Sequence, residues 1–204
     1  TDNLCAAGGV FLNCPSNTRI LKETNFKNLF IPPMVNDSGL SLGSALALYH
    51  NILDYPLNND FVPSQSDAYL GMKRSYSDES IKLACDKYKD SISIQYLGDK
   101  AAKKAAKDLD KDRVIAIFYE RSEAGPRALG HRSILANPSK KHNWERVNKI
   151  KSRELWRPFA PACIEEDVGE YFKNDIKSDS LWYMLLNLEV TDQNLPAITH
   201  VDQT

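Results

Sequence analysis

The first candidates for chemistry are three arginines, Arg121, Arg127 and Arg132, in the stretch ERSEAGPRALGHRSILANP at residues 120–138. Two glycines and a proline interrupt this stretch, so the arginines are expected to leave a non-helical turn. A guanidinium group presents a planar fork of donors that suits phosphate or carboxylate better than lysine does. The alternative is that the arginines pair with glutamates of the same stretch. The pattern therefore indicates either an anion site or ordinary surface ion pairs.

A second group of cations lies in KSRELWRPFAP, residues 151–161, where a predicted helix meets a proline. Lys151, Arg153 and Arg157 fall within seven residues of one another. A pocket lined by both groups would hold up to five cations, which repel one another unless an anion is bound. The pattern favours a polyanionic ligand. Two alternatives stay open, because nearby glutamates could neutralise part of the charge and a charged run is often a solvated face.

Weaker candidates lie near the beginning of the chain. Gly8 and Gly9 follow a short apolar segment, and glycines at such a position let backbone N–H groups approach a phosphate. No complete GxGxxG or P-loop motif accompanies them. Asp37 precedes an apolar helical pattern, where an aspartate serves as an N-cap or as one ligand of a metal or a magnesium nucleotide. The four histidines lack metal-ligand spacing, and no site is assigned to them.

An α/β pattern followed by an α+β pattern must position these candidates. In the first part, apolar strands at residues 3–7 and 28–33 flank a helix, and a long, mostly buried helix follows at residues 40–53. An extended connection at residues 55–67 and a helix capped by Ser77 come next. The second part begins near Ser91. Its expected elements are helices at residues 99–112 and 140–153 and strands at residues 113–120, 159–164 and 183–190.

The composition narrows the classes of partner. The 26 basic and 27 acidic residues nearly balance, so a general electrostatic attraction to nucleic acid or to an anionic membrane is not expected. No apolar run reaches the roughly 20 residues that span a bilayer. The four cysteines lack CxxC spacing and are expected to be buried thiols of a cytoplasmic protein. The first and last residues interrupt apparent elements, which predicts that the sequence is a fragment.

Four stretches together resemble the O-carbamoyltransferase family of nodulation-factor and antibiotic biosynthesis, the NodU-type enzymes. They are AAGGVFLNCPSNTRI, PPMVNDSGLSLGSAL, RSEAGPRALGHRSILANP and VNKIKSRELWRPFAPACIEED, in this order along most of the chain. One position departs from the family pattern, because Glu120 stands where the family usually has glycine before the RSE triplet. The resemblance implies the tail of an actin- or sugar-kinase-like domain at residues 1–92 and a truncated YrdC-like domain at residues 93–204.

The resemblance also implies an activity. Family members use carbamoyl phosphate and ATP to form carbamoyl-adenylate in the YrdC-like part. They then transfer the carbamoyl group to an acceptor hydroxyl in the kinase-like part, which holds a divalent metal, iron or magnesium. The histidine pair that helps to hold this metal is expected upstream of the present sequence. The implied partners are therefore carbamoyl phosphate and a hydroxyl-bearing small molecule, with no nucleic acid and no membrane, and a homodimer is possible.

Carried over position by position, the resemblance assigns roles to nine residues. The implied catalytic contacts are Lys151, Arg157 and Arg127; the substrate neighbours are Arg132, Ser133 and Arg153; the nucleotide-side glycines are Gly8 and Gly9; and the metal or phosphate ligand is Asp37. Two other classes of function stay open at this point. The chain could be an RNA-binding module of the YrdC-like type, against which its near-neutral charge argues, or a structural remnant that binds no ligand.

Overall fold

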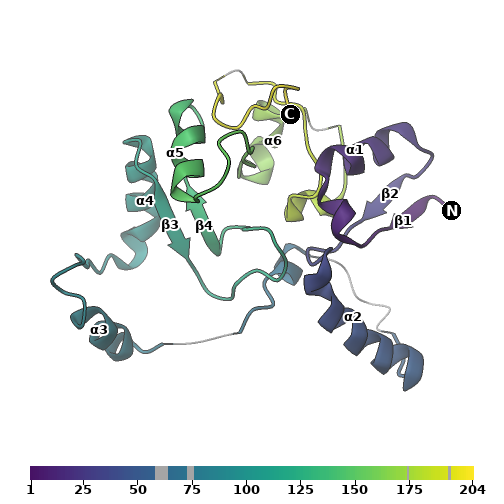
Figure 1. The fold of residues 1–204 in the computed structure, drawn as a ribbon, viewed down its shortest axis with the longest axis horizontal. Helices are drawn as coiled ribbons and strands as arrows, with labels where there is room; N and C mark the ends of the chain where they lie inside the picture. The colour runs from purple at the N-terminus through teal and green to yellow at the C-terminus, as the bar shows by residue number, and fades with distance from the viewer. Residues whose placement is uncertain (58–63, 73–75, 174, 193) are drawn as a thin grey trace.

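The computed structural model describes residues 1–57, 64–72, 76–173, 175–192 and 194–204 (Figure 1). In chain order, its helices and strands are β1 (Asn3–Cys5), α1 (Cys14–Glu23), β2 (Asn28–Phe30), α2 (Leu40–Leu46), α3 (Asp78–Asp86), α4 (Ala101–Asp110), β3 (Ile115–Phe118), β4 (Arg132–Leu135), α5 (His142–Ile150) and α6 (Val168–Tyr171). The mixture of helices and strands confirms the predicted α/β class. The finer division into a kinase-like and a YrdC-like architecture stays a prediction.

The first part of the chain forms a small βαβ unit. Strands β1 and β2 pair in parallel, with Asn3 opposite Asn28, and α1 connects them. Helix α1 begins where the sequence provides a cap, because the Ser16 backbone N–H donates to the Asn13 side chain at 3.1 Å. Pro15 fits the first turn, where its missing N–H removes no helical hydrogen bond. We call residues 1–46 the first unit.

The C-terminal part of the chain returns to complete the core of the first unit. Tyr183, Leu185 and Ile176 are buried in one apolar cluster with residues of β2 and the segment after it. The Ile31 backbone N–H donates to the Ser180 hydroxyl at 3.1 Å. The side chain of Asn17 on α1 donates to the Leu185 carbonyl at 2.8 Å. Residues on both sides of the predicted division at residue 92 therefore share one core, and the division itself stays a prediction.

The second sheet is an antiparallel pair that carries the arginine stretch between its strands. Ile115 of β3 lies opposite Leu135 of β4, and Phe118 lies opposite Arg132. Helices α4 and α5 lie beside this pair (Figure 1). The structure confirms the predicted helices at residues 99–112 and 140–153 and the strand at residues 113–120, each with shorter bounds. The expectation that this strand is buried is wrong, because Phe118 is 78% exposed. It also confirms the Ser77 cap of α3, whose hydroxyl accepts from the Ser80 N–H at 3.2 Å.

Four other predictions are wrong. Residues 159–164 form no strand, and residues 183–190 contribute only an isolated bridge between Val190 and Phe172. The apolar helix expected to be buried is exposed: α2 projects from the molecule, and Leu40 is 66% exposed (Figure 1). The cysteines are free but not buried, since Cys5 and Cys163 are exposed and the other two are partly exposed.

The connection predicted at residues 55–67 lies partly outside the described residues, which omit residues 58–63. Within the described part of the chain, no helix has the length and apolar character required to cross a membrane.

Candidate functional site

The arginine turn between β3 and β4 is organised by a carboxylate. Glu123 Oε1 accepts three backbone N–H groups, from Leu129 at 2.7 Å, His131 at 2.9 Å and Arg132 at 3.1 Å. Burial raises the pKa of the Glu123 carboxyl, but the hydrogen bonds from the backbone amides outweigh burial and leave the pKa below its usual value. Converging amides of this kind form an anion-binding concavity. In this turn, the protein's own glutamate fills it.

Arg132 holds the outer side of the same turn. Its Nη1 donates to the Tyr119 carbonyl at 2.6 Å, and its Nη2 donates to the Glu120 carbonyl at 3.0 Å. The guanidinium also lies 3.5 Å from the centroid of the Phe118 ring. Because a guanidinium has five N–H donors in a fixed fork, these contacts leave few of them for a ligand.

Two further side chains of the turn, those of Ser133 and Arg121, differ in burial. Ser133, predicted to contact substrate, is buried, and its hydroxyl accepts the Gly130 N–H at 2.9 Å. Arg121 is exposed, and its side chain makes no hydrogen bond or ion pair with any described residue. Its carbonyl lies 2.6 Å from Nδ1 of His131. The geometry therefore gives Ser133 a place inside the turn, whereas Arg121 faces solvent.

Arg127 lies at the tip of the turn and contacts the first unit. Its Nη2 donates to the Leu12 carbonyl at 2.9 Å and lies 3.6 Å from the Cys14 sulfur. Its Nε is buried and has no partner among the described residues. Burial raises the pKa of the Cys14 thiol, and the nearby Arg127 charge offsets part of this effect. Gly125 touches the first unit as well, because an added Cβ would lie 2.2 Å from the Pro33 carbonyl oxygen.

The second predicted group forms a real cluster of charge, which we call the cationic loop (residues 151–157). Burial lowers the pKa of Lys151, and the charges of Arg153 and Arg157 lower it further. The pKa of Arg153 is lowered by burial and then by Arg157. The three cations therefore lie close enough for the charges of Arg153 and Arg157 to act on Lys151. In the described part of the chain, the one carboxylate that pairs with them is Glu154, 3.8 Å from Arg157.

Two side chains of α5 hold the cationic loop, and the sequence analysis assigned neither to the site. Asn148 is fully buried: its Nδ2 donates to the Arg157 carbonyl at 3.0 Å and the Leu155 carbonyl at 3.2 Å. Its Oδ1 accepts from Arg153 Nε at 2.5 Å. Trp144 Nε1 donates to the Arg157 carbonyl at 2.8 Å. The sequence signal that could have identified them is helical spacing: Trp144 and Asn148 are four residues apart, and such residues lie on one face of a helix.

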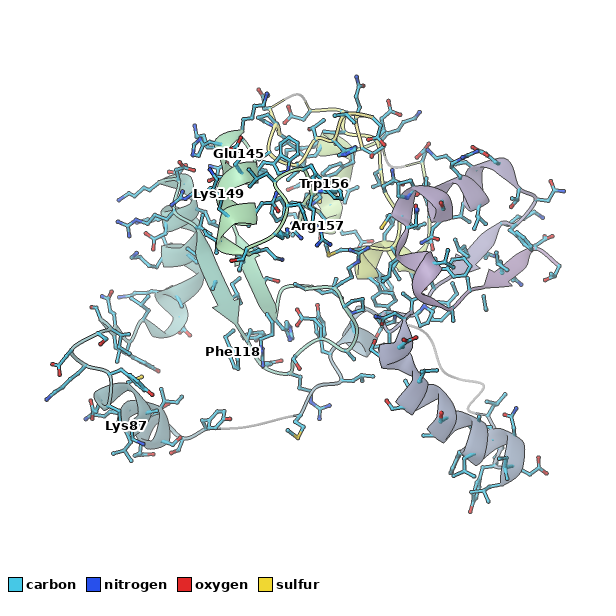
Figure 2. The ribbon with its side chains drawn as sticks, in the orientation of Figure 1. Lys87, Phe118, Glu145, Lys149, Trp156 and Arg157 are labelled. Carbon is cyan, nitrogen blue, oxygen red and sulfur yellow. The ribbon has the colours of Figure 1, made fainter. Side chains whose placement is uncertain are left out.

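The two cationic groups do not form one contact network. Among the described residues, no hydrogen bond, ion pair or ring contact joins Arg127 or Arg132 to the cationic loop. Figure 2 shows Phe118, on which Arg132 stacks, well apart from Arg157. The structure therefore brings together Lys151, Arg153 and Arg157, while Arg127 and Arg132 are held elsewhere. The expected pocket lined by both groups is not formed by direct contacts.

The candidates of the first unit differ in their surroundings. The Gly8 N–H already donates to the Val35 carbonyl at 2.7 Å, whereas an added Cβ at Gly8 or Gly9 would meet open space. Asp37 does not cap a helix, because the cap position of its 3₁₀ turn is Asn36. The Asp37 carboxylate is exposed and makes no hydrogen bond or ion pair within the described residues.

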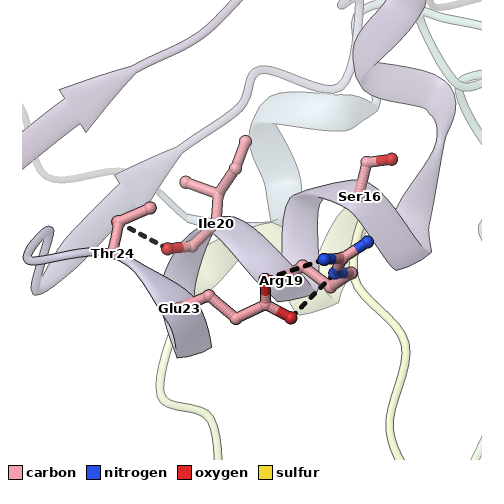
Figure 3. A pocket seen from close by; sticks show the side chains of 5 residues that line it. All are labelled: Ser16, Arg19, Ile20, Glu23 and Thr24. Atoms are coloured by element: carbon pink, nitrogen blue, oxygen red, sulfur yellow. Dashed lines mark hydrogen bonds and ion pairs between the residues drawn. The ribbon is translucent and has the colours of Figure 1, made fainter.

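Two hollows on the surface are lined largely by other residues, although one includes Trp144, which contacts the cationic loop. One open pocket lies along α1, between Ser16 and Thr24, where Arg19 and Glu23 pair through two hydrogen bonds of 2.8 and 2.9 Å (Figure 3). Another, of about 420 Å³, lies between Trp144 of α5 and His200 in the C-terminal segment. Neither is lined by a residue that the sequence analysis assigned to the site.

Two family models match the chain: "Carbamoyltransferase N-terminus" over residues 1–46 and "Carbamoyltransferase C-terminus" over residues 106–204. Nodulation protein NolO of Bradyrhizobium diazoefficiens is 37% identical over 205 residues, which cover 98% of this chain and 36% of that protein. The 3'-hydroxymethylcephem-O-carbamoyltransferase of Streptomyces clavuligerus is 32% identical over 199 residues, 98% of this chain and 35% of that enzyme. The chain belongs to the carbamoyltransferase family.

Nodulation protein U of Rhizobium fredii is a third relative, 30% identical over 203 residues, which cover 98% of this chain and 31% of that protein. The carbamoyltransferase chain thus spans about a third of the length of the curated relatives that it matches. These matches confirm the family that the four sequence stretches resembled. They give no support to the RNA-binding alternative.

Contacts at the tip of the arginine turn link the two parts of the chain that the family models match. Arg127 and Gly125 belong to the C-terminal match, whereas Leu12 and Pro33 belong to the N-terminal match. The divalent metal that the family resemblance implied does not fit the described residues by themselves. No group of three or more His, Cys, Asp or Glu side chains in this part of the chain could hold a metal ion, and Asp37 is at most a single ligand.

Proposed function

We propose that the cationic loop binds the phosphate groups of carbamoyl phosphate and ATP in an O-carbamoyltransferase. The observation that carries this proposal is that Lys151, Arg153 and Arg157 share one short loop, in which the one paired acid among the described residues is Glu154, 3.8 Å from Arg157. Burial and then the charges of the two arginines lower the pKa of Lys151, in agreement with this clustering. Clustered cations with so little neutralisation are stabilised when an anion binds between them. A relative whose name states O-carbamoyltransferase activity supports the reaction class.

The reaction that fits this loop is formation of carbamoyl-adenylate. Hydrolysis of carbamoyl phosphate by water gives carbamate and inorganic phosphate, and a carbamate oxygen then attacks the α-phosphate of ATP while pyrophosphate leaves. Lys151 is suited to a single phosphate oxygen, and Arg157 presents a fork for two. Their contribution is positioning and charge stabilisation, without a covalent intermediate on the protein. Attack of an acceptor hydroxyl on the carbamoyl carbon releases AMP and gives the carbamate ester.

The experiment that tests the proposal compares K151A and R157A with wild type in carbamoyl phosphate-dependent release of pyrophosphate from ATP. All three are made in a protein of the relatives' full length, because this chain spans about a third of that length and is expected to be inactive in transfer by itself. Removal of either cation is expected to lower the rate roughly 100-fold or more. K149A is the matched control, because Lys149 is an exposed cation of α5 that pairs at 3.5 Å with Glu145 (Figure 2). Unchanged turnover in both variants would contradict the proposal, as would flat calorimetric titrations of the chain with both ligands.

A further inference from the structure

Glu123 closes the base of the arginine turn. The tip of the turn comprises residues 124–128, and the hydrogen bond from the Leu129 N–H to Glu123 joins the two residues on either side of it. The hydrogen bonds from the His131 and Arg132 N–H groups extend this contact to the first residue of β4. The tip contains both groups that touch the first unit, Gly125 and Arg127. We propose that Glu123 is a positioning residue whose carboxylate fills the amide concavity and thereby holds Arg127 against the first unit.

The arrangement of the backbone supports this role. The amides of the turn point inward onto one carboxylate oxygen, whereas carbonyls on the outer side accept from the Arg132 guanidinium. Segment 68–71 fixes the side next to Glu123, because the Gly71 N–H donates to the Ser122 carbonyl at 3.0 Å and the Ala124 N–H donates to the Ala68 carbonyl at 2.6 Å. Without the carboxylate, three amides in a partly buried site would have no acceptor, which is unfavourable.

The charge of Glu123 should matter more than its shape. An ionised carboxylate accepts hydrogen bonds that are about twice as strong as those to a neutral acceptor. Glutamine keeps the oxygen in place but removes the charge, so E123Q should weaken the turn and E123A should weaken it more. Alanine also opens a space shaped for an anion. A small external carboxylate such as acetate should therefore enter the vacated concavity in E123A and restore the turn.

Hydrogen exchange of the amides of Leu129, His131 and Arg132 tests this inference directly. We expect exchange about tenfold or more faster in E123A, an intermediate rate in E123Q, and slowing by acetate in E123A alone. E120Q is the matched control, because Glu120 is an exposed glutamate of the same turn and should exchange like wild type. Exchange at the wild-type rate in E123Q and E123A, or no response of E123A to acetate, would overturn the inference. E123Q keeps the test decisive in case E123A does not fold.

The consequence for the reaction rests on the proposed function and has its own readout. E123A should lower kcat of carbamoyl phosphate-dependent pyrophosphate release, and acetate should restore it. If E123A has a loosened turn but wild-type turnover, Glu123 does not position Arg127 for the reaction. If the wild type itself shows no such turnover, the proposed function fails, whereas the exchange experiment still decides the role of Glu123 in the turn.

Discussion

Substitution of Asn148 by alanine is the sharpest test of how the cationic loop is held. The change removes two hydrogen bonds to loop carbonyls and one from the Arg153 guanidinium. Net values of about 1 kcal/mol for each neutral bond and 1.5–3 kcal/mol for the charged one give an upper sum of about 5 kcal/mol. Water can replace part of this at the exposed Leu155 and Arg157. The expected loss is therefore about 2–3 kcal/mol, which is large against a total stability of about 5–15 kcal/mol.

Urea unfolding followed by circular dichroism measures this loss in the free energy of unfolding. In a separate thermal scan, the melting temperature should fall by roughly 5–10 °C. N148D separates the contributions, because it keeps an acceptor for Arg153 but loses the donor to the two carbonyls. K149A is the control, since exposed ion pairs of this kind contribute about 0.5 kcal/mol or less. A change in N148A no larger than that in K149A would refute the reasoning that a buried amide organises the loop.

Three further predictions concern the turn and the core. G125A should be at least about 2 kcal/mol less stable than G130A. Both glycines have a positive φ, 109° and 106°, but only at Gly125 would the added Cβ lie against a carbonyl, that of Pro33. Equal urea midpoints would contradict this. Burial raises the pKa of Tyr183 to about 12, so its stabilising contribution is complete below pH about 10 and is lost as pH rises through about 12; Y183F should remove this alkaline dependence in urea titrations. The lowered pKa of Glu123 gives stability that is present above its ordinary value of 4.5 and lost as pH falls through the folded value, so E123Q should flatten the acid limb of the stability curve.

The sequence predicted local helices well because their signals are local. The alanine-rich pattern of α4 and the Ser77 cap of α3 depend on propensity and on hydrogen bonds within one turn. Strand β3 was predicted from an apolar, β-branched run, and its partner β4 supplies the pairing that such a run requires. The predicted elements extended one to three residues too far at most ends, where fraying and tertiary contacts determine the boundary.

Tertiary contacts explain the predictions that failed. In the run at residues 183–190, Tyr183, Leu185 and Leu186 are buried by side chains of the first unit rather than by a neighbouring strand. Asn17 donates to the Leu185 carbonyl, and Met184 turns the backbone with a φ of 55°. Residues 159–164 include a proline and follow another, so the segment lacks the donors of a ladder. For α2, the apolar pattern was read correctly, but no packing partner covers it among the described residues.

The candidate site was predictable where it depends on residue type and not where it depends on hydrogen-bond partners. The cationic loop could be recognised because three cations close in sequence remain close after a helix end. The fate of Arg132 could not be read from the sequence, since its acceptors are backbone carbonyls that any residue supplies. For the same reason, the positioning roles of Glu123 and Asn148 could not be predicted from the sequence, because their partners are backbone groups as well.

The two sets of cations differ in a way that decides which one can bind an anion. In the turn, Arg132 donates through both Nη atoms to backbone carbonyls, and Arg127 donates through Nη2 to the first unit while its buried Nε has no partner among the described residues. In the cationic loop, the Lys151 ammonium makes no hydrogen bond or ion pair within the described residues, and burial and then the charges of Arg153 and Arg157 lower its pKa. An anion at the loop relieves that repulsion without breaking a bond. Under the proposed function, a phosphate ligand would therefore bind at the loop, and the turn would contribute through the contacts of Arg127 and Gly125 with the first unit.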